Sequence, residues 1–114
     1  MTKADQFYLA AETIAETIED QDIADAYVTL CVHAGIAAAD VICCARLGQY
    51  AQGDDHQEAV ALLSKADRAQ AKHLKVLLDL KTHSGYSATP MGATNQKRAG
   101  RAAAALVGAA RAVG

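Results

Sequence analysis

An imidazole and a carboxylate lie at helical spacing in the most apolar part of the chain. His33 and Asp40 are the ionisable side chains between Ala26 and Ala45, apart from the cysteines and Tyr27, and their spacing places them on one helix face about two turns apart. A buried carboxylate is costly unless it has a partner. Asp40 therefore belongs either to a structural tie or to a ligand-facing seam. The candidate partners from the rest of the chain are Lys81, Arg98, Arg101 and the hydroxyl of Tyr86.

A second group of reactive side chains lies at the end of a predicted helix. Lys81, His83 and Tyr86 bring a cation, an imidazole and a phenol together within six residues. We expect the helix to end near His83, because the segment 84–92 contains two glycines and Pro90. Binding and catalytic residues are often found on such loops, so this segment is the favoured place for a functional loop.

The chain has few of the motifs that hold metals or cofactors. Asp79 and His83 are four residues apart and could chelate, but the chain contains neither H-E-x-x-H nor repeated E-x-x-H. It also has no phosphate-binding glycine motif and no G-x-S-x-G. We therefore expect no metal site and no cofactor. The cysteines are odd in number and have no C-x-x-C spacing, so we expect reduced thiols on a buried helix. They are Cys31, Cys43 and Cys44.

Charge is divided unevenly along the sequence. All 13 acidic residues lie before Lys81, which gives residues 1–80 a net charge of -7, and the remainder has five bases and a net charge of +5. The five bases are Lys81, Lys97, Arg98, Arg101 and Arg111. Such asymmetry can mark a surface for an anionic partner such as RNA. It can equally reflect a basic last helix lying beside the acidic first one, and the acidity of that first helix favours this second interpretation.

The elements that must position these residues are all predicted to be helices. Only 4% of the residues are aromatic and no segment alternates with a period of two, which argues against a sheet. Apolar residues in 23–48 recur at helical spacing and extend beyond one stripe, so this helix should be the inner member of a bundle. We expect one all-α domain, residues 1–114, an up-and-down bundle of about five helices with a four-helix core. The expected helices are 2–20, 23–48, one capped by Asp54 or Asp55, one from Asp67 to His83, and one from Thr94 to Val113.

The N-terminus also bears on where the protein acts. Its acidic residues replace the basic start that a signal peptide needs. Asp40 interrupts the most apolar stretch, which we judge too short for the roughly 20 residues of a membrane span. We therefore expect a cytoplasmic protein with no membrane contact.

Three segments together give the chain a likeness to a known family. These are the alanine-rich helix with Asp40, the Gly-Asp-Asp-His sequence that ends at His56, and the L-L-D-L-K-x-x-S-x-Y block that ends at Tyr86. Together they resemble the HEPN superfamily of small helical bundles, over roughly Tyr27 to Arg111. The resemblance implies RNA cleavage or a nucleotide-linked system, a homodimer, and a toxin-antitoxin pairing with a nucleotidyltransferase.

The resemblance also identifies candidate catalytic positions. Active members of the family use an arginine, four to six further residues and a histidine, which two subunits bring together in a metal-independent ribonuclease site. This chain has Lys81 at the arginine position and Tyr86 at the histidine position. Lysine has no bidentate fork, and a phenol with a pKa of about 10 is a poor general base at neutral pH. His83 is the remaining candidate base, and the departures favour a protein that is not an enzyme.

Three hypotheses follow for the function. The first is a HEPN-like module without catalytic activity that binds nucleotide, RNA or a partner protein through its basic C-terminal surface. The second is a ribonuclease that uses His83 as the base and Lys81 to stabilise negative charge. The third is a purely structural bundle. The expected ligand-binding residues are Lys81, Tyr86, Lys97, Arg98, Arg101, Asp40 and His33.

Overall fold

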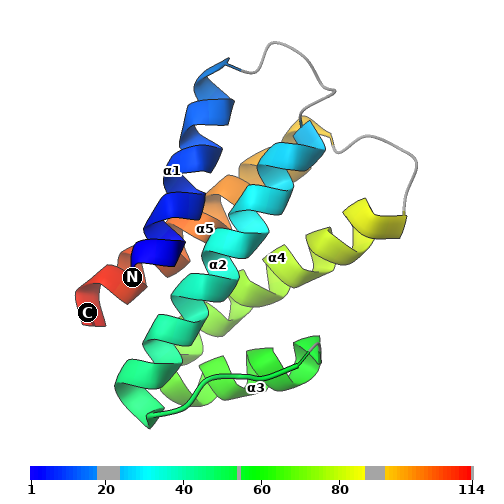
Figure 1. Ribbon diagram of the computed structural model, residues 1–114. Coiled ribbons are helices and arrows are strands. Elements are labelled where there is room, and N and C mark those ends of the chain that lie inside the picture. Colours follow the sequence, from blue (N-terminus) through cyan, green and yellow to red (C-terminus); the bar gives the residue numbers. More distant parts are fainter. Residues whose placement is uncertain (18–23, 54, 87–91, 114) are drawn as a thin grey trace.

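The computed structural model is a bundle of helices (Figure 1), which confirms the all-α fold class. It describes residues 1–17, 24–53, 55–86 and 92–113, but not the side chains of residues 16, 17, 24 and 82–86. The helices in these ranges are α1 (Thr2–Thr17), α2 (Ala24–Leu47), α3 (His56–Ala66), α4 (Arg68–Tyr86) and α5 (Ala93–Val113). No strand occurs in the described ranges.

The four long helices alternate in direction along the bundle. In Figure 1, α1 and α4 run upward and α2 and α5 run downward, while the shorter α3 crosses the lower end. Helix α2 contacts each of the other four helices, and α3 lies against α4 and α2. The expectation that α2 is the inner helix is thus confirmed.

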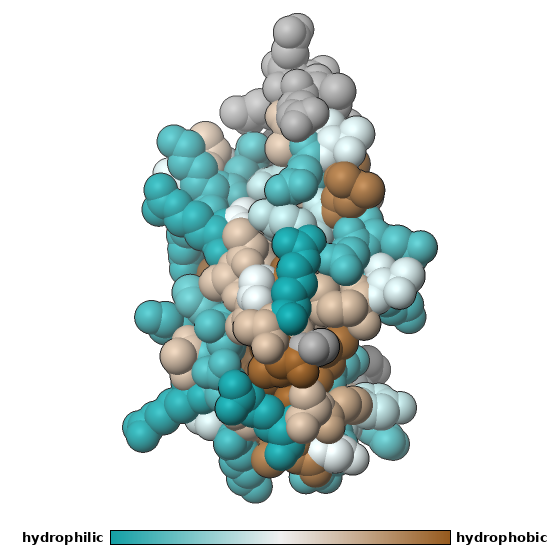
Figure 2. Space-filling view, turned by 90° about the vertical axis from the view of Figure 1, so that its left-hand side faces the viewer, coloured by the Kyte–Doolittle hydropathy of each residue, from teal (hydrophilic) through white to brown (hydrophobic). Residues whose placement is uncertain are grey.

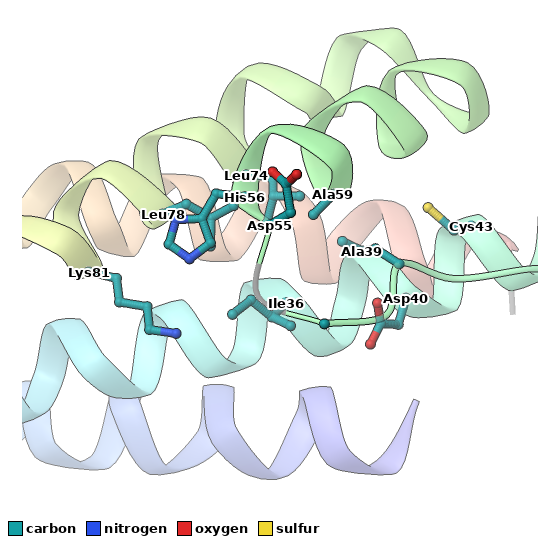
Figure 3. Close-up of a pocket in the computed structure, with 12 residues that line it drawn as sticks. Ile36, Ala39, Asp40, Cys43, Asp55, His56, Ala59, Leu74, Leu78 and Lys81 are labelled. Atoms are coloured by element: carbon teal, nitrogen blue, oxygen red, sulfur yellow. The ribbon is translucent and has the colours of Figure 1, made fainter.

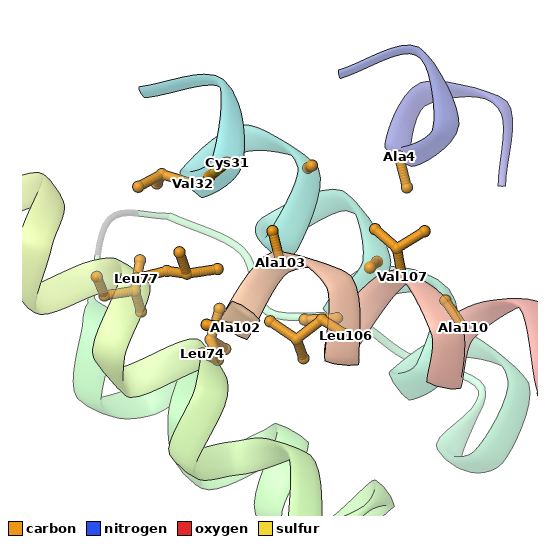
Figure 4. Packing of buried hydrophobic residues seen from close by; sticks show 14 of the residues in the cluster. Ala4, Cys31, Val32, Leu74, Leu77, Ala102, Ala103, Leu106, Val107 and Ala110 are labelled. Carbon is orange, nitrogen blue, oxygen red and sulfur yellow. The ribbon is translucent and has the colours of Figure 1, made fainter. Parts of the chain in front are cut away.

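Helices α2, α4 and α5 form a core of small and branched side chains. Figure 4 shows Ala102, Ala103 and Leu106 of α5 turned toward side chains of α2 and α4. Gly35 of α2 allows this close packing, because a β-carbon there would collide with the side chain of Leu77. The largest fully buried side chains are Ile42, Leu63, Leu77, Leu106, Val28, Val32, Val107 and Cys31.

Helix α1 makes a looser outer layer. Leu9 is 64% exposed on this helix, and the face on which α1 and both termini lie shows brown and tan surface bordered by teal (Figure 2). The two chain ends come together there, because Arg111 donates hydrogen bonds of 2.8 and 3.1 Å to Oδ1 of Asp5. An ion pair exposed on both sides adds little stability.

Local signals fix most helix boundaries. Gly48 and Gly53 both adopt positive φ, 70° and 88°, which suits glycine at the two sides of a turn. Asp55 is the N-cap of α3, and its Oδ1 accepts a 3.1 Å hydrogen bond from the backbone N–H of Glu58.

The predicted end of the fourth helix is wrong. Helix α4 continues through Ser84 and Gly85 to Tyr86, whereas the sequence predicts a loop from Ser84. A glycine costs a helix only about 1 kcal/mol, and the buried leucines of α4 hold the helix against α2 and α5. The part of the expected loop at 87–91 is outside the described residues.

The length of α2 also corrects a prediction about membranes. At about 1.5 Å per residue, its 24 residues are long enough to span a bilayer, and Asp25–Leu47 passes a test of length and hydropathy for a membrane span. The core helix of a soluble protein can have the same length and composition, and half of the most apolar segment of α2 is buried inside the bundle. The central position of α2 accounts for its apolar composition.

Candidate functional site

A cavity of about 180 Å³ opens between α2, α3, α4 and the loop before α3. Figure 3 shows its lining: Ile36 and Asp40 come from α2, His56 from the start of α3, and Leu78 and Lys81 from α4. Apolar side chains therefore form the middle of the cavity, and ionisable groups lie around it.

Helical spacing explains how three elements supply this lining. On α2 the lining residues are Ile36, Ala39, Asp40 and Cys43, and on α4 they are Leu74, Leu78 and Lys81. Residues at intervals of three, four and seven share a helix face. The N-cap of α3 then sets where His56 and Ala59 begin to cover the groove between α2 and α4.

Asp40 is half-buried at the rim of this cavity. Burial raises the pKa of its carboxyl, and the positive charge of Lys3 opposes that rise. Among the described residues, Asp40 forms no ion pair with the predicted partners Lys81, Arg98 or Arg101, and the side chain of Tyr86 is outside the described residues. The cation that acts on Asp40 in the described part of the chain is Lys3 of α1. The reason is that α1 runs antiparallel to α2, so its first turn lies beside the C-terminal half of α2.

His33 lies outside the cavity and contacts α1 instead. Its ring stacks on Phe7 with centroids 5.1 Å apart and planes at 26°, although the residue as a whole is exposed. His33 and Asp40 therefore do share one side of α2, as their spacing predicts, and α1 is the element that meets both.

Three of the predicted ligand-binding bases lie together on α5. Lys97, Arg98 and Arg101 are all exposed, and Arg98 Nη1 donates a 3.2 Å hydrogen bond to Asn95 Oδ1 within the same helix. In the described part of the chain, the ion pairs are Lys75–Asp79 and Arg111–Asp5. The contact of the basic helix with the acidic first helix is thus made by Arg111, at the opposite end of α5 from the three bases.

Lys81 is exposed and extends along the end of the cavity toward α2 (Figure 3). His83 and Tyr86 lie on the last turns of α4, and their side chains are outside the described residues.

The three cysteines are free thiols in different surroundings. Burial raises the pKa of Cys31 to about 11, opposed by a hydrogen bond with Tyr27. Cys43 is buried and lines the cavity, where burial and the nearby Asp40 raise the pKa of its thiol. Cys44 is exposed, contrary to the prediction of three buried thiols, because neighbouring helix positions are about 100° apart.

The cavity includes residues that sequence reasoning missed as site residues. His56 and Cys43 were not among the predicted site residues, yet both line this space. His56 directly follows Asp55, and Cys43 lies three residues after Asp40 on the same helix. These local relations do not show that α3 folds back across α2 and α4, which is what brings the residues to one cavity. No protein family, curated protein or solved structure matches the chain.

Proposed function

We propose that this chain is a HEPN-like helical module without catalytic activity that binds RNA through the outer surface of α5. The supporting observation is a cluster of three exposed bases, Lys97, Arg98 and Arg101. No acidic residue occurs in the sequence from Lys81 to the end.

The spacing of the three bases suits a phosphate backbone. Lys97 and Arg101 are four residues apart and Arg98 and Arg101 three apart, so their β-carbons lie about 5–6 Å from one another on the helix surface. A single strand of RNA that extends along this surface can place neighbouring phosphates against more than one of these bases. Arginine can also bind a phosphate with two parallel hydrogen bonds.

The size of the cavity favours a polymer over an enclosed nucleotide. Pockets that enclose drug-sized ligands usually measure about 300–1,000 Å³, whereas the cavity beside Lys81 measures about 180 Å³. An open surface such as α5 can instead bind a chain that extends past it. RNA is therefore our preferred ligand, and a free nucleotide is an outcome of the test.

Catalysis is disfavoured by the chemistry of α4. Lys81 and Tyr86 occupy the positions at which the HEPN resemblance would require arginine and histidine. Lysine has no bidentate fork, and a phenol is a poor general base at neutral pH. The resemblance further suggests a homodimer that works in the cytoplasm with a nucleotidyltransferase. These remain parts of the proposal.

The test compares RNA affinity at two salt concentrations by fluorescence anisotropy. Three phosphate contacts on single-stranded RNA predict a slope of about −2 in the logarithm of affinity against the logarithm of salt concentration, so a fourfold increase in salt should weaken binding about twentyfold. The variant Lys97→Gln, Arg98→Gln, Arg101→Gln should lose most of the affinity and of the salt dependence.

A matched control removes three other exposed bases. The variant Lys65→Gln, Arg68→Gln, Lys72→Gln changes the net charge by the same amount on α3 and α4 and should bind RNA nearly as well as the original chain. Equal loss in both variants would mean general charge attraction and would refute a site on α5. Cleavage of RNA in the presence of a chelator, lost in His83→Ala, would show that the protein is a ribonuclease.

A further inference from the structure

The cavity between α2, α3 and α4 has opposite charges at its two ends. Figure 3 shows Asp40 at one end and Lys81 at the other, with Ile36 and His56 between them. Asp40 is half-buried and Lys81 is exposed. Among the described residues, neither of the two takes part in an ion pair. Lys3 of α1 is close enough to act on the charge of Asp40 but forms no ion pair with it, so both charges can pair with a bound molecule.

The other described carboxylate that lines the cavity already accepts a hydrogen bond. Asp55 caps α3, since its Oδ1 accepts the hydrogen bond from Glu58. Among the described carboxylates that line the cavity, Asp40 is the one without a hydrogen bond to the protein, so it is the better acceptor for an ammonium group. The apolar side chains of Ile36 and Leu78 lie along the space between the two charges.

The volume limits what can enter. A cavity of about 150 Å³ holds benzene, with its six heavy atoms. A volume of about 180 Å³ therefore corresponds to a molecule of about seven or eight heavy atoms on the same scale. Such a molecule has room for two charged groups and a short hydrocarbon chain.

We propose that this cavity binds a short ω-amino acid, whose ammonium pairs with Asp40 while its carboxylate pairs with Lys81. The hydrocarbon chain lies on Ile36 and Leu78, and Ala59 of α3 bounds the space from the other side. An α-amino acid fits less well, because its two charges are held on one carbon atom. This site is independent of the RNA surface proposed for α5.

The experiment is a titration of the full isotope-labelled chain followed by NMR. The probes are 4-aminobutyrate and its isomer 2-aminobutyrate, which has the same atoms but adjacent charges. We expect 4-aminobutyrate to shift the amide signals of 36–43 and 56–59 in a saturable way and to bind at least about tenfold more tightly than the isomer, because hydrogen bonds to charged groups are strong. Equal binding of the two isomers, or no saturable shift with 4-aminobutyrate, would overturn the proposal.

Two kinds of variant test separately how the charges and the shape of the cavity contribute to binding. Asp40→Asn and Lys81→Gln should each weaken 4-aminobutyrate binding at least about tenfold, and Ala59→Leu should block it while leaving every charge in place. Asp79→Asn removes an exposed carboxylate outside this cavity and should leave binding unchanged. Binding that survives Ala59→Leu, or that Asp79→Asn weakens as much as Asp40→Asn does, would contradict the assignment.

Discussion

The two faces of α5 differ in burial and in charge. The inner face carries buried alanines together with Leu106 and Val107 and no charged residue, whereas the outer face carries Lys97, Arg98 and Arg101. Small side chains on the inner face let α5 approach α2 and α4 closely. Substitutions on the inner face should therefore change stability, and those on the outer face should change binding.

The largest expected effect is the loss of a leucine from the inner face. Leu106 is fully buried, and removing a buried leucine side chain costs about 2–5 kcal/mol through lost burial and a residual cavity. We expect Leu106→Ala to lower the free energy of unfolding by about 3 kcal/mol, measured by urea denaturation. A loss below about 1 kcal/mol, the range of an ordinary surface substitution, would contradict the burial of this face.

Two glycines of α5 provide a matched pair. A β-carbon at Gly100 would collide with the hydroxyl of Tyr27, whereas nothing lies within 4 Å of a β-carbon at Gly108. Gly108→Ala should stabilise the protein by up to about 1 kcal/mol, because alanine favours helix. Gly100→Ala should destabilise it by about 1 kcal/mol through overpacking.

Tyr27→Phe supplies the control for that collision. Removing the hydroxyl should make Gly100→Ala less harmful in the double variant than in the single one, and the difference is measured by a double-mutant cycle of unfolding free energies. Independent, additive effects of the two substitutions would show that Tyr27 does not limit the space at Gly100.

Asp40 on the central helix is half-buried, whereas the charged residues of α5 are exposed. The pH dependence of stability therefore tests the cost of partly burying a charge. Burial raises the pKa of Asp40 in the folded state, so the folded chain holds this proton more tightly and loses stability as pH rises through the interval between the unfolded and folded pKa. Asp40→Asn should therefore stabilise the protein at neutral pH by a few tenths of a kcal/mol, within the range of partly exposed positions. The gain should disappear at a pH below both values, as measured by thermal unfolding across pH.

The smallest expected effect belongs to the ion pair at the chain ends. Arg111 and Asp5 are both exposed, and such pairs contribute about 0.2–1 kcal/mol. Asp5→Asn should lower the unfolding free energy by less than about 0.5 kcal/mol, and added salt should reduce the difference. A loss above 1 kcal/mol would mean that α1 is held chiefly by this pair.

Sequence patterning was sufficient for the helices and their order. Apolar periodicity gave α2, and the Asp55 cap gave the start of α3, because both signals act within a few residues. The end of α4 was wrong, since local glycine and serine preferences were outweighed by packing of the leucines upstream.

The candidate site depends on how helices that are distant in the sequence pack together, which local patterns do not show. The shared side of His33 and Asp40 followed from helical geometry, but their neighbours on α1 depended on the register of two antiparallel helices. Likewise, the cavity required α3 to fold back over α2 and α4. The helical spacing of alanines and bases on α5 was sufficient to predict that the three bases are exposed. It could not show that Lys81 lies at the cavity and away from those bases.

The most direct test of the division between the two faces is to locate bound RNA by NMR on the full isotope-labelled chain. We predict that single-stranded RNA shifts the amide signals of 97–101 on α5, and that the signals of 36–43 beside the cavity stay in place. The triple glutamine variant of α5 should remove these shifts while unfolding at the same temperature as the original chain. Shifts centred on the cavity, or shifts that persist in that variant, would contradict the account.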